Sequence, residues 1–301
     1  MSTEPHLEIP PAWENLPLDA LRGVLMVIGA PDVGKSTLAH YLFERLKQAN
    51  PSGKQGRSLA YVDGDPGQTN LGPPATITAC LAPLDICSNT VSTLGENKLR
   101  RYFIGSTSPR GHMLPMVVGA ARLVQAAEAD TLVYDTCGLV DPAQGGQALK
   151  MAKIDLLQPS MIFAIQREHE LEPLLVPLRL SGRVRVVTLR PSAAASRKAN
   201  THRRAHRRRK YAAHFKGSRI VEVDWTKLAV FPRPDFSMQR LVALEDAAGF
   251  TLALGIVREI DRQARKVSIQ TPLASLDDVR SLHLGDVSVD PHDYQDQLMG
   301  M

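Results

Sequence analysis

Short apolar runs alternate with helical patterns through the first two thirds of the chain. Runs that end in polar or turn-forming residues predict strands at 24–29, 59–62, 131–134, 161–165 and 184–189. Apolar residues spaced three or four apart predict helices at 35–47, 114–129, 147–157 and 168–178. Strands that are apolar throughout and alternate with helices are typical of a parallel sheet covered on both faces. The pattern therefore predicts an α/β fold with a doubly wound, mostly parallel sheet.

The pattern changes after residue 232. Residues 239–254 and 255–270 resemble short alternating strands that break at 246–249 and 261–265, and shorter apolar pieces follow. This arrangement favours a small β-barrel or sandwich. Pro232 and Pro234 mark a boundary, because two prolines so close together cannot continue a central strand or a helix. We expect an N-terminal segment at 1–22, an α/β domain at 23–232 and a C-terminal β module at 233–301.

Composition and charge add one local feature to this picture. Among 301 residues, 22% are charged and 44% hydrophobic, as in an ordinary globular protein. The net charge is +5, but ten Lys and Arg fall at 191–221, where no acid occurs, and all other residues together carry −5. A slightly acidic body thus carries one strongly basic element.

The sequence favours a cytoplasmic location. Residues 1–16 lack the basic flank and apolar stretch of a secretory signal. The apolar run at 23–30 is far shorter than the roughly 20 residues that cross a bilayer. Cys80, Cys87 and Cys137 lack CxxC spacing, which argues against a disulfide framework or a zinc site. We expect Cys80 and Cys87 to be small buried residues.

A glycine-rich segment follows the first predicted strand and opens a helix, and it satisfies G-x-x-x-x-G-K-[ST]. Its residues are Gly29, Ala30, Pro31, Asp32, Val33, Gly34, Lys35, Ser36 and Thr37. The glycines let successive backbone N–H groups face the β- and γ-phosphates of a nucleotide, while Lys35 adds a point charge. The Ser36 hydroxyl can bind Mg²⁺. The motif in this context predicts a P-loop NTPase domain rather than a turn that binds nothing.

Two carboxylates and an amide, Asp63, Asp65 and Gln68, cluster after the next predicted strand. The carboxyl ends of strands form the catalytic edge of an open α/β sheet. Carboxylates there can orient Mg²⁺ or accept a proton from an attacking hydroxyl. The competing interpretation is a plain loop, because acids before Pro and Gly also form turns.

The strand at 131–134 leads into Asp-Thr-Cys-Gly at 135–138, where Asp135 suits the magnesium side of a nucleotide site. Interpreted as D-x-x-G, the same segment suits a GTPase switch. A GTPase also needs N-K-x-D after that switch, whereas Asn97-Lys98 precedes it and continues with Leu99 and Arg100. Guanine specificity is therefore unsupported.

Five segments in order carry a family resemblance. They are GAPDVGKST at 29–37, VDGDPGQTNLGPPAT at 62–76, YFIGSTSP at 102–109, DTCG at 135–138 and a basic segment that ends in Phe215-Lys216-Gly217. Over 24–217 the chain resembles the polynucleotide 5′-hydroxyl-kinase family, and 240–290 more loosely resembles the C-terminal barrel of its compact members. The resemblance implies ATP and Mg²⁺ as cofactors, an arginine-rich lid helix within 195–217, and RNA or DNA with a 5′-hydroxyl end as the partner.

The resemblance also implies roles for individual residues. Lys35 would hold the phosphates and Ser36 the magnesium. Asp65 falls where the family's general base takes the proton from the 5′-hydroxyl, and it also lies on the metal side with Asp63. Gln68 would support the phosphates of the substrate. One aligned carboxylate is a sufficient base, because phosphoryl transfer depends mostly on positioning and charge stabilisation.

The clasp that holds the terminal nucleotide departs from the family pattern. Thr136 and Gly138 match Thr-x-Gly-Trp, but Leu139 stands where the tryptophan is usual. Stacking of a base on an aromatic ring is worth about 1–3 kcal/mol. The base-stacking platform is therefore not carried over, and base or sugar preference does not follow from the resemblance.

The basic segment places eight Lys or Arg within 197–210. If it is helical, like charges stand at i,i+4, so an anion must compensate them. The resemblance implies a lid in which Arg203 and either Lys198 or the adjacent Arg197 reach the transferring phosphoryl group, and we favour Arg197 for its planar fork. Arg207 would bind the phosphate backbone of the substrate. A solvated surface helix and a localisation or nonspecific nucleic-acid signal remain alternatives.

The sequence thus predicts an ATP-dependent polynucleotide 5′-hydroxyl kinase. Two other functions stay open. One is an ATP-binding adaptor of RNA processing with little or no catalysis, which the missing tryptophan favours. The other is a P-loop kinase of a small metabolite, for which the basic segment carries more charge than is needed.

Overall fold

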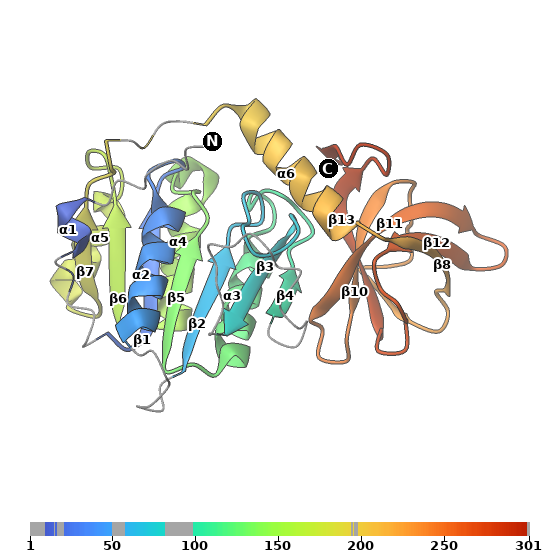
Figure 1. Ribbon diagram of the computed structural model, residues 1–301, viewed down its shortest axis with the longest axis horizontal. Coiled ribbons are helices and arrows are strands. Elements are labelled where there is room, and N and C mark those ends of the chain that lie inside the picture. The colour runs from blue at the N-terminus through green and yellow to red at the C-terminus, as the bar shows by residue number, and fades with distance from the viewer. Residues whose placement is uncertain are drawn as a thin grey trace. The chain divides into compact units, whose positions relative to one another are not determined.

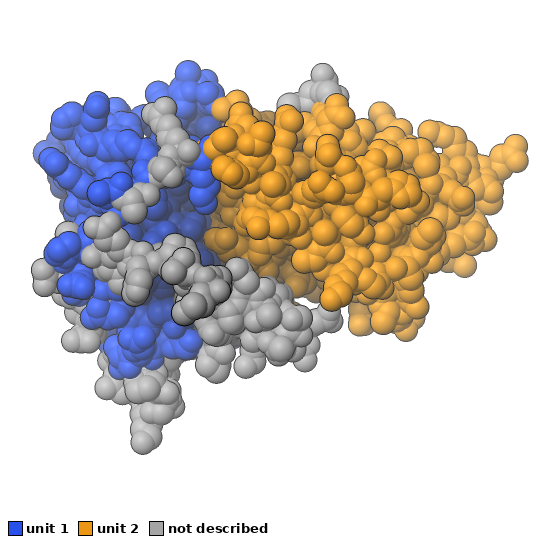
Figure 2. Space-filling model, turned by 45° about the horizontal axis from the view of Figure 1, so that its top comes forward, with its two compact units in different colours: residues 1–62, 81–87, 128–198 blue, residues 63–80, 88–127, 199–301 orange. Residues whose placement is uncertain are grey.

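The computed structural model describes residues 10–14, 16, 21–49, 58–81, 99–193, 195 and 198–299. Cys87 and Arg197 lie outside the described residues. The chain divides into two compact units, which Figure 2 colours separately. Unit 1 comprises 1–62, 81–87 and 128–198, and unit 2 comprises 63–80, 88–127 and 199–301. In the described part of the chain, no helix combines the length and the hydrophobicity that a membrane span requires.

A seven-stranded sheet, sheet A, has the strand order β4-β3-β2-β5-β1-β6-β7 (Figure 1). Its strands are β1 Gly23–Gly29, β2 Leu59–Gly64, β3 Thr76–Leu81, β4 Leu99–Phe103, β5 Thr131–Thr136, β6 Met161–Ile165 and β7 Arg185–Leu189. Strand β1 runs parallel to β5 and β6, and β6 runs parallel to β7. The predicted α/β fold with a mostly parallel sheet is confirmed. The sequence did not predict β3 and β4, which pair antiparallel.

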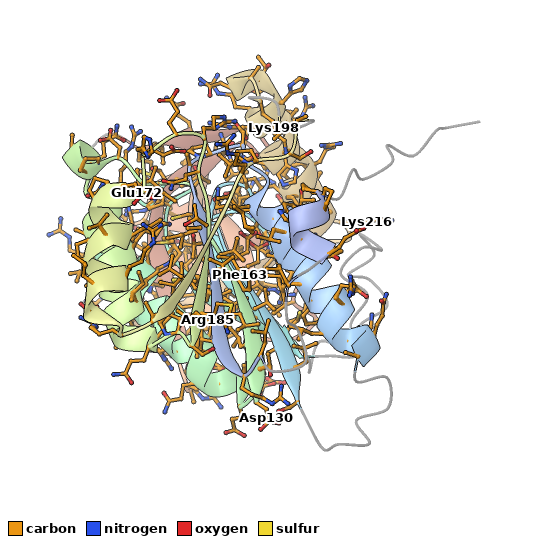
Figure 3. The ribbon with its side chains drawn as sticks, turned by 90° about the vertical axis from the view of Figure 1, so that its left-hand side faces the viewer. Asp130, Phe163, Glu172, Arg185, Lys198 and Lys216 are labelled. Carbon is orange, nitrogen blue, oxygen red and sulfur yellow. The ribbon has the colours of Figure 1, made fainter. Side chains whose placement is uncertain are left out.

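Helices cover both faces of the parallel strands. The helices before the C-terminal region are α1 Pro11–Glu14, α2 Lys35–Ala49, α3 Met113–Ala127, α4 Gly146–Leu157 and α5 Glu172–Ser181. In Figure 3, α5, marked by Glu172, lies on one side of the strands, and α2 lies on the other. Residues 25–28 of β1 are fully buried between these layers. Because both faces of the strand are covered, its sequence is a continuous apolar run.

Sheet B belongs to unit 2 and has the order β14-β13-β10-β11-β12-β8, with β9 beside β13. Its strands are β8 Arg219–Asp224, β9 Ala229–Phe231, β10 Arg240–Glu245, β11 Thr251–Asp261, β12 Lys266–Thr271, β13 Ser281–Val289 and β14 Asp296–Leu298. The predicted breaks at 246–249 and 261–265 are the turns between β10, β11 and β12. Sheet B also includes β8 and β9, which precede the boundary expected at Pro232.

Both faces of sheet B are apolar. Leu241 and Ala243 of β10 join one buried cluster, whereas the alternate residues Val242 and Leu244 join another. Helix α6, Asn200–His214, leads into β8 and contributes Tyr211 to the first cluster, as does the adjoining residue Phe215. The basic segment is therefore helical, and its C-terminal end is part of the core of unit 2.

Two half-buried histidines are expected to make the fold sensitive to acid. Burial, together with the nearby charge of Arg101, lowers the pKa of His214 to about 3, and its neutral Nε2 accepts a hydrogen bond from Leu254 N at 3.0 Å. Burial lowers the pKa of His40 to about 4. We expect the free energy of unfolding to fall as the pH drops below about 6.5, because the unfolded chain then binds protons that the folded chain excludes.

Denaturant unfolding measured between pH 7.5 and pH 5 checks this expectation. The variant His214→Gln keeps an acceptor for Leu254 N and removes the titrating group. Its free energy of unfolding is expected to depend less steeply on pH than that of the wild type. Equal slopes for the two proteins would show that His214 is not buried in its neutral form.

Candidate functional site

The glycine-rich loop joins β1 to α2 within unit 1. Gly34 has φ +94°, in the region that favours glycine. A Cβ atom at Gly29 would lie 2.6 Å from the Ile165 carbonyl oxygen and 2.8 Å from a methyl of Val33. Ser36 and Thr37 are half-buried in the first turn of α2. Since the first N–H groups of a helix have no partner within it, the loop and α2 present backbone donors suited to an anion.

Lys35 lies close over this loop. Its side chain is buried, and Nζ donates a hydrogen bond to the Ala30 carbonyl oxygen at 2.7 Å. An ammonium group in that position can exchange a carbonyl oxygen for a phosphate oxygen, which forms a stronger, charge-assisted bond. The geometry thus suits the phosphate-binding role predicted for Lys35.

Asp32 ties the loop to two other segments of unit 1. Arg167 Nη2 donates to the Asp32 carbonyl oxygen at 3.0 Å, and the backbone N–H of Lys198 donates to Asp32 Oδ2 at 3.1 Å. In Figure 3, Lys198 lies at the carboxyl end of the parallel strands, whereas Asp130 lies at the opposite end. The segment that leads into α6 is therefore attached to the phosphate loop in unit 1.

The predicted clasp segment also packs against the phosphate loop. A Cβ atom at Gly138 would lie 3.0 Å from three atoms of Pro31. Thr136 Oγ1 donates to the Val27 carbonyl oxygen at 2.8 Å, so its hydroxyl binds the neighbouring strand. Lys150, fully buried on α4, donates to the Cys137 carbonyl oxygen at 2.5 Å. No sequence pattern indicated Lys150, because a lysine on a helix is usually exposed.

In unit 2, the Asp63 side chain stabilises the loop at residues 63–71. Its Oδ2 accepts from Thr69 Oγ1 at 2.9 Å, Asn70 N at 2.5 Å and Leu71 N at 3.0 Å. Burial raises the pKa of Asp63 above its ordinary value, although these hydrogen bonds oppose the shift. Its other oxygen, Oδ1, accepts from Asp65 N at 3.4 Å, so both carboxylate oxygens help to fold the loop.

Asp65 has one fixed oxygen and one available oxygen. Oδ1 accepts from Gly67 N at 2.9 Å and Gln68 N at 3.0 Å. Within the part of the chain that the structure describes, Oδ2 accepts no hydrogen bond, and the residue is half-buried. Gly67 allows close packing here, since a Cβ atom would lie 2.4 Å from the Thr107 carbonyl oxygen. A carboxylate oriented through one oxygen is well suited to accept a proton on the other.

Helix α6 binds this loop along one face. Gln68 Nε2 donates to the Arg203 carbonyl oxygen at 3.4 Å, and His206 Nε2 donates to the Thr69 carbonyl oxygen at 2.9 Å. One turn later, Lys210 Nζ donates to the Asn70 carbonyl oxygen. Residues 203, 206 and 210 are spaced three and four apart, as residues on one face of a helix are. The sequence analysis did not use this spacing. The helix predicted as the lid is therefore fastened to the loop that carries Asp65.

Arg207 already has a carboxylate partner. Its Nε lies 3.0 Å and 2.8 Å from the two carboxylate oxygens of Asp296. The side chains of Arg207 and Asp296 are only 16% and 4% exposed. By contrast, Arg204 and Arg209 are exposed on the outer face of α6. The structure thus pairs one predicted substrate contact with an acid of sheet B and leaves other arginines on the surface.

Comparisons with known proteins agree on one family. The family model for the mRNA cleavage and polyadenylation factor CLP1 P-loop matches residues 29–217. A polyribonucleotide 5′-hydroxyl-kinase of Pyrococcus furiosus is 28% identical over 88% of this chain and 87% of its own. One of Methanocaldococcus jannaschii is 26% identical with the same coverage. A CLP1 homologue of Anopheles gambiae is 23% identical over 76% of this chain and 56% of its own.

A solved structure shares the fold. Wild-type Clp1p, from its complex with Pcf11p, superposes with a TM-score of 0.67 at 15% identity, covering 88% of this chain and 74% of that one. The family model covers more than half of the 301 residues. The chain therefore belongs to the family of the mRNA cleavage and polyadenylation factor CLP1 P-loop.

Proposed function

We propose that the protein is a polynucleotide 5′-hydroxyl kinase, which transfers the γ-phosphate of ATP to the 5′-hydroxyl end of RNA or DNA. The observation that carries this proposal is Asp65, whose Oδ1 is fixed by two backbone N–H groups while Oδ2 is left to accept a proton. The phosphate loop in the same chain supports it, as do relatives named polyribonucleotide 5′-hydroxyl-kinases.

The phosphate loop is proposed to bind the ATP donor. Backbone N–H groups of the loop and the start of α2 bind the β- and γ-phosphates, and Lys35 moves from the Ala30 carbonyl oxygen to a phosphate oxygen. Gly138 keeps the clasp segment close to Pro31 in this loop. The Ser36 hydroxyl at the start of α2 is a hard oxygen donor of the kind that Mg²⁺ prefers. When bound, Mg²⁺ supplies positive charge to the phosphate oxygens.

Asp65 is the proposed general base of the reaction. Asp65 Oδ2 takes the proton of the 5′-hydroxyl while the hydroxyl oxygen forms a bond to the γ-phosphorus. The bond from this phosphorus to the β,γ-bridging oxygen breaks, which releases ADP. The Arg203 guanidinium offsets the charge of the transferring group. Gln68 and His206 keep α6 against the loop that carries Asp65.

The outer arginines of α6 are proposed to bind the phosphate backbone of the substrate. Replacing both Arg204 and Arg209 by Gln is expected to raise KM for a 5′-hydroxyl oligonucleotide and leave KM for ATP unchanged. The slope of log KM against log salt should fall by about 0.7 for each phosphate of a single strand that the variant no longer binds. Steady-state kinetics at several salt concentrations measure this slope. Arg262→Gln, in the exposed turn after β11, is the matched control.

An ADP-release assay tests the proposed function against its alternatives. The proposal predicts that ADP forms with a 5′-hydroxyl oligonucleotide and not with its 5′-phosphorylated form. Comparable turnover with a free nucleoside, weakly dependent on salt, would instead support a kinase of a small metabolite. Tight ATP binding without turnover on any of these acceptors would support an adaptor, which the leucine at 139 favours.

A further inference from the structure

Helix α6, the predicted lid, contacts residues 293–296 as well as residues 63–71, which carry Asp65 and are called the acceptor loop below. Arg207 pairs with Asp296, the first residue of β14, through both carboxylate oxygens. Arg208 Nε donates to the Asp293 carbonyl oxygen at 2.7 Å. The rings of Phe215 and Tyr294 stack with centroids 5.8 Å apart and planes 3° apart. Residues 293–296 thus contact the helix region from Arg207 to Phe215.

The Arg207–Asp296 ion pair also offsets repulsion between like charges within α6. Arg203 and Arg207 stand at i,i+4, as do Arg204 and Arg208, and like charges at this spacing destabilise a helix. Asp296 supplies a negative charge at one of these four positions. Because its carboxylate is only 4% exposed, removing it would leave the Arg207 guanidinium, itself 16% exposed, largely buried without its counter-ion.

The orientation of Arg207 is linked to that of the predicted catalytic arginine. Arg203 lies about one helical turn before Arg207 on the same side of α6. The Arg203 carbonyl oxygen accepts from Gln68, whose backbone N–H is bound by Asp65 Oδ1. Fixing the helix at Arg207 therefore fixes both its rotation and its position along the loop that carries Asp65.

We propose that Asp296 is a positioning residue for phosphoryl transfer, which acts through Arg207 to hold the lid helix against the acceptor loop. This inference rests on the proposed kinase function. Sheet B would then contribute to catalysis, because β14 carries the carboxylate that holds α6 in position. Arg207 then pairs with Asp296 and does not bind the phosphate backbone of the substrate, the role that the sequence analysis predicts for it.

The variant Asp296→Asn tests the anchor. Loss of the carboxylate is expected to lower kcat for a 5′-hydroxyl oligonucleotide by about tenfold, because the lid arginine is no longer held in place. The Kd of ATP should change less than about twofold. Hydrogen exchange of the amides at 203–210 should become faster. Glu222→Gln is the matched control, since it makes the same change in an exposed ion pair of sheet B with Lys266.

A double variant separates positioning from loss of fold. Replacing Arg207 by Met and Asp296 by Leu removes both charges and keeps an apolar contact, so it should regain most of the lost kcat. An Asp296→Asn protein with wild-type kcat and exchange rates would overturn the inference. A double variant that folds but is no more active than Asp296→Asn would also overturn it. A wild-type protein without kinase activity would instead refute the proposed function itself.

Discussion

Replacing Asp65 by Asn is expected to abolish phosphoryl transfer, with kcat falling by about a thousandfold, the scale of a lost general base. The amide oxygen of Asn can still accept from Gly67 N and Gln68 N, so the loop keeps its shape. The other carboxylate oxygen, which takes the proton, becomes an NH₂ group that cannot. Single-turnover transfer from labelled ATP to a 5′-hydroxyl oligonucleotide measures the loss.

The affinity for ATP is the internal control for this variant. Because Asp65 lies outside the phosphate loop, the Kd of ATP should remain nearly unchanged in Asp65→Asn. A variant that transfers phosphate as fast as the wild type would reassign the general base. Loss of ATP binding together with transfer would place Asp65 in nucleotide binding instead.

Replacing Lys35 by Ala is expected to weaken ATP binding and to slow turnover together. Its ammonium group is buried over the loop, 2.7 Å from the Ala30 carbonyl oxygen. A hydrogen bond to a charged group contributes roughly 1.5–3 kcal/mol, so the Kd of ATP should rise by about ten- to a hundredfold. The value of kcat should fall by at least about a hundredfold, because the same charge stabilises the transition state.

Calorimetric titration with ATP and steady-state kinetics measure the two effects of Lys35→Ala. Lys47→Ala is the matched control, because Lys47 lies in the last turn of the same helix and pairs with Glu44. The control should bind ATP like the wild type. Unchanged kcat in Lys35→Ala would contradict a role for this lysine in catalysis.

The sequence predicted the features that depend on local pattern. The buried strands β1, β5 and β6 have continuous apolar runs because both faces are covered, and such runs are visible without a structure. The phosphate loop is equally local, since its glycines meet specific needs for backbone conformation and close packing. Strands β3 and β4 were missed because polar residues interrupt both, as Arg100 and Arg101 do in β4.

The parts of the site that sequence reasoning missed depend on contacts between distant residues. Asp296 follows Arg207 by 89 residues, and Thr69 precedes His206 by 137. No local pattern indicates either pair, because each depends on how sheet B and the acceptor loop fold around α6. The sequence did predict that the crowded arginines need an anion, and the structure shows that the chain supplies one at Asp296.

The most direct test of the central claim follows the γ-phosphate itself. Wild-type protein is incubated with Mg²⁺, γ-labelled ATP and a 5′-hydroxyl oligonucleotide, and the product is treated with a phosphatase that removes terminal phosphates. The proposed function predicts label on the 5′ end of the oligonucleotide, which the phosphatase releases. ATP turnover that leaves the label only in free phosphate, with none on the oligonucleotide, would contradict it.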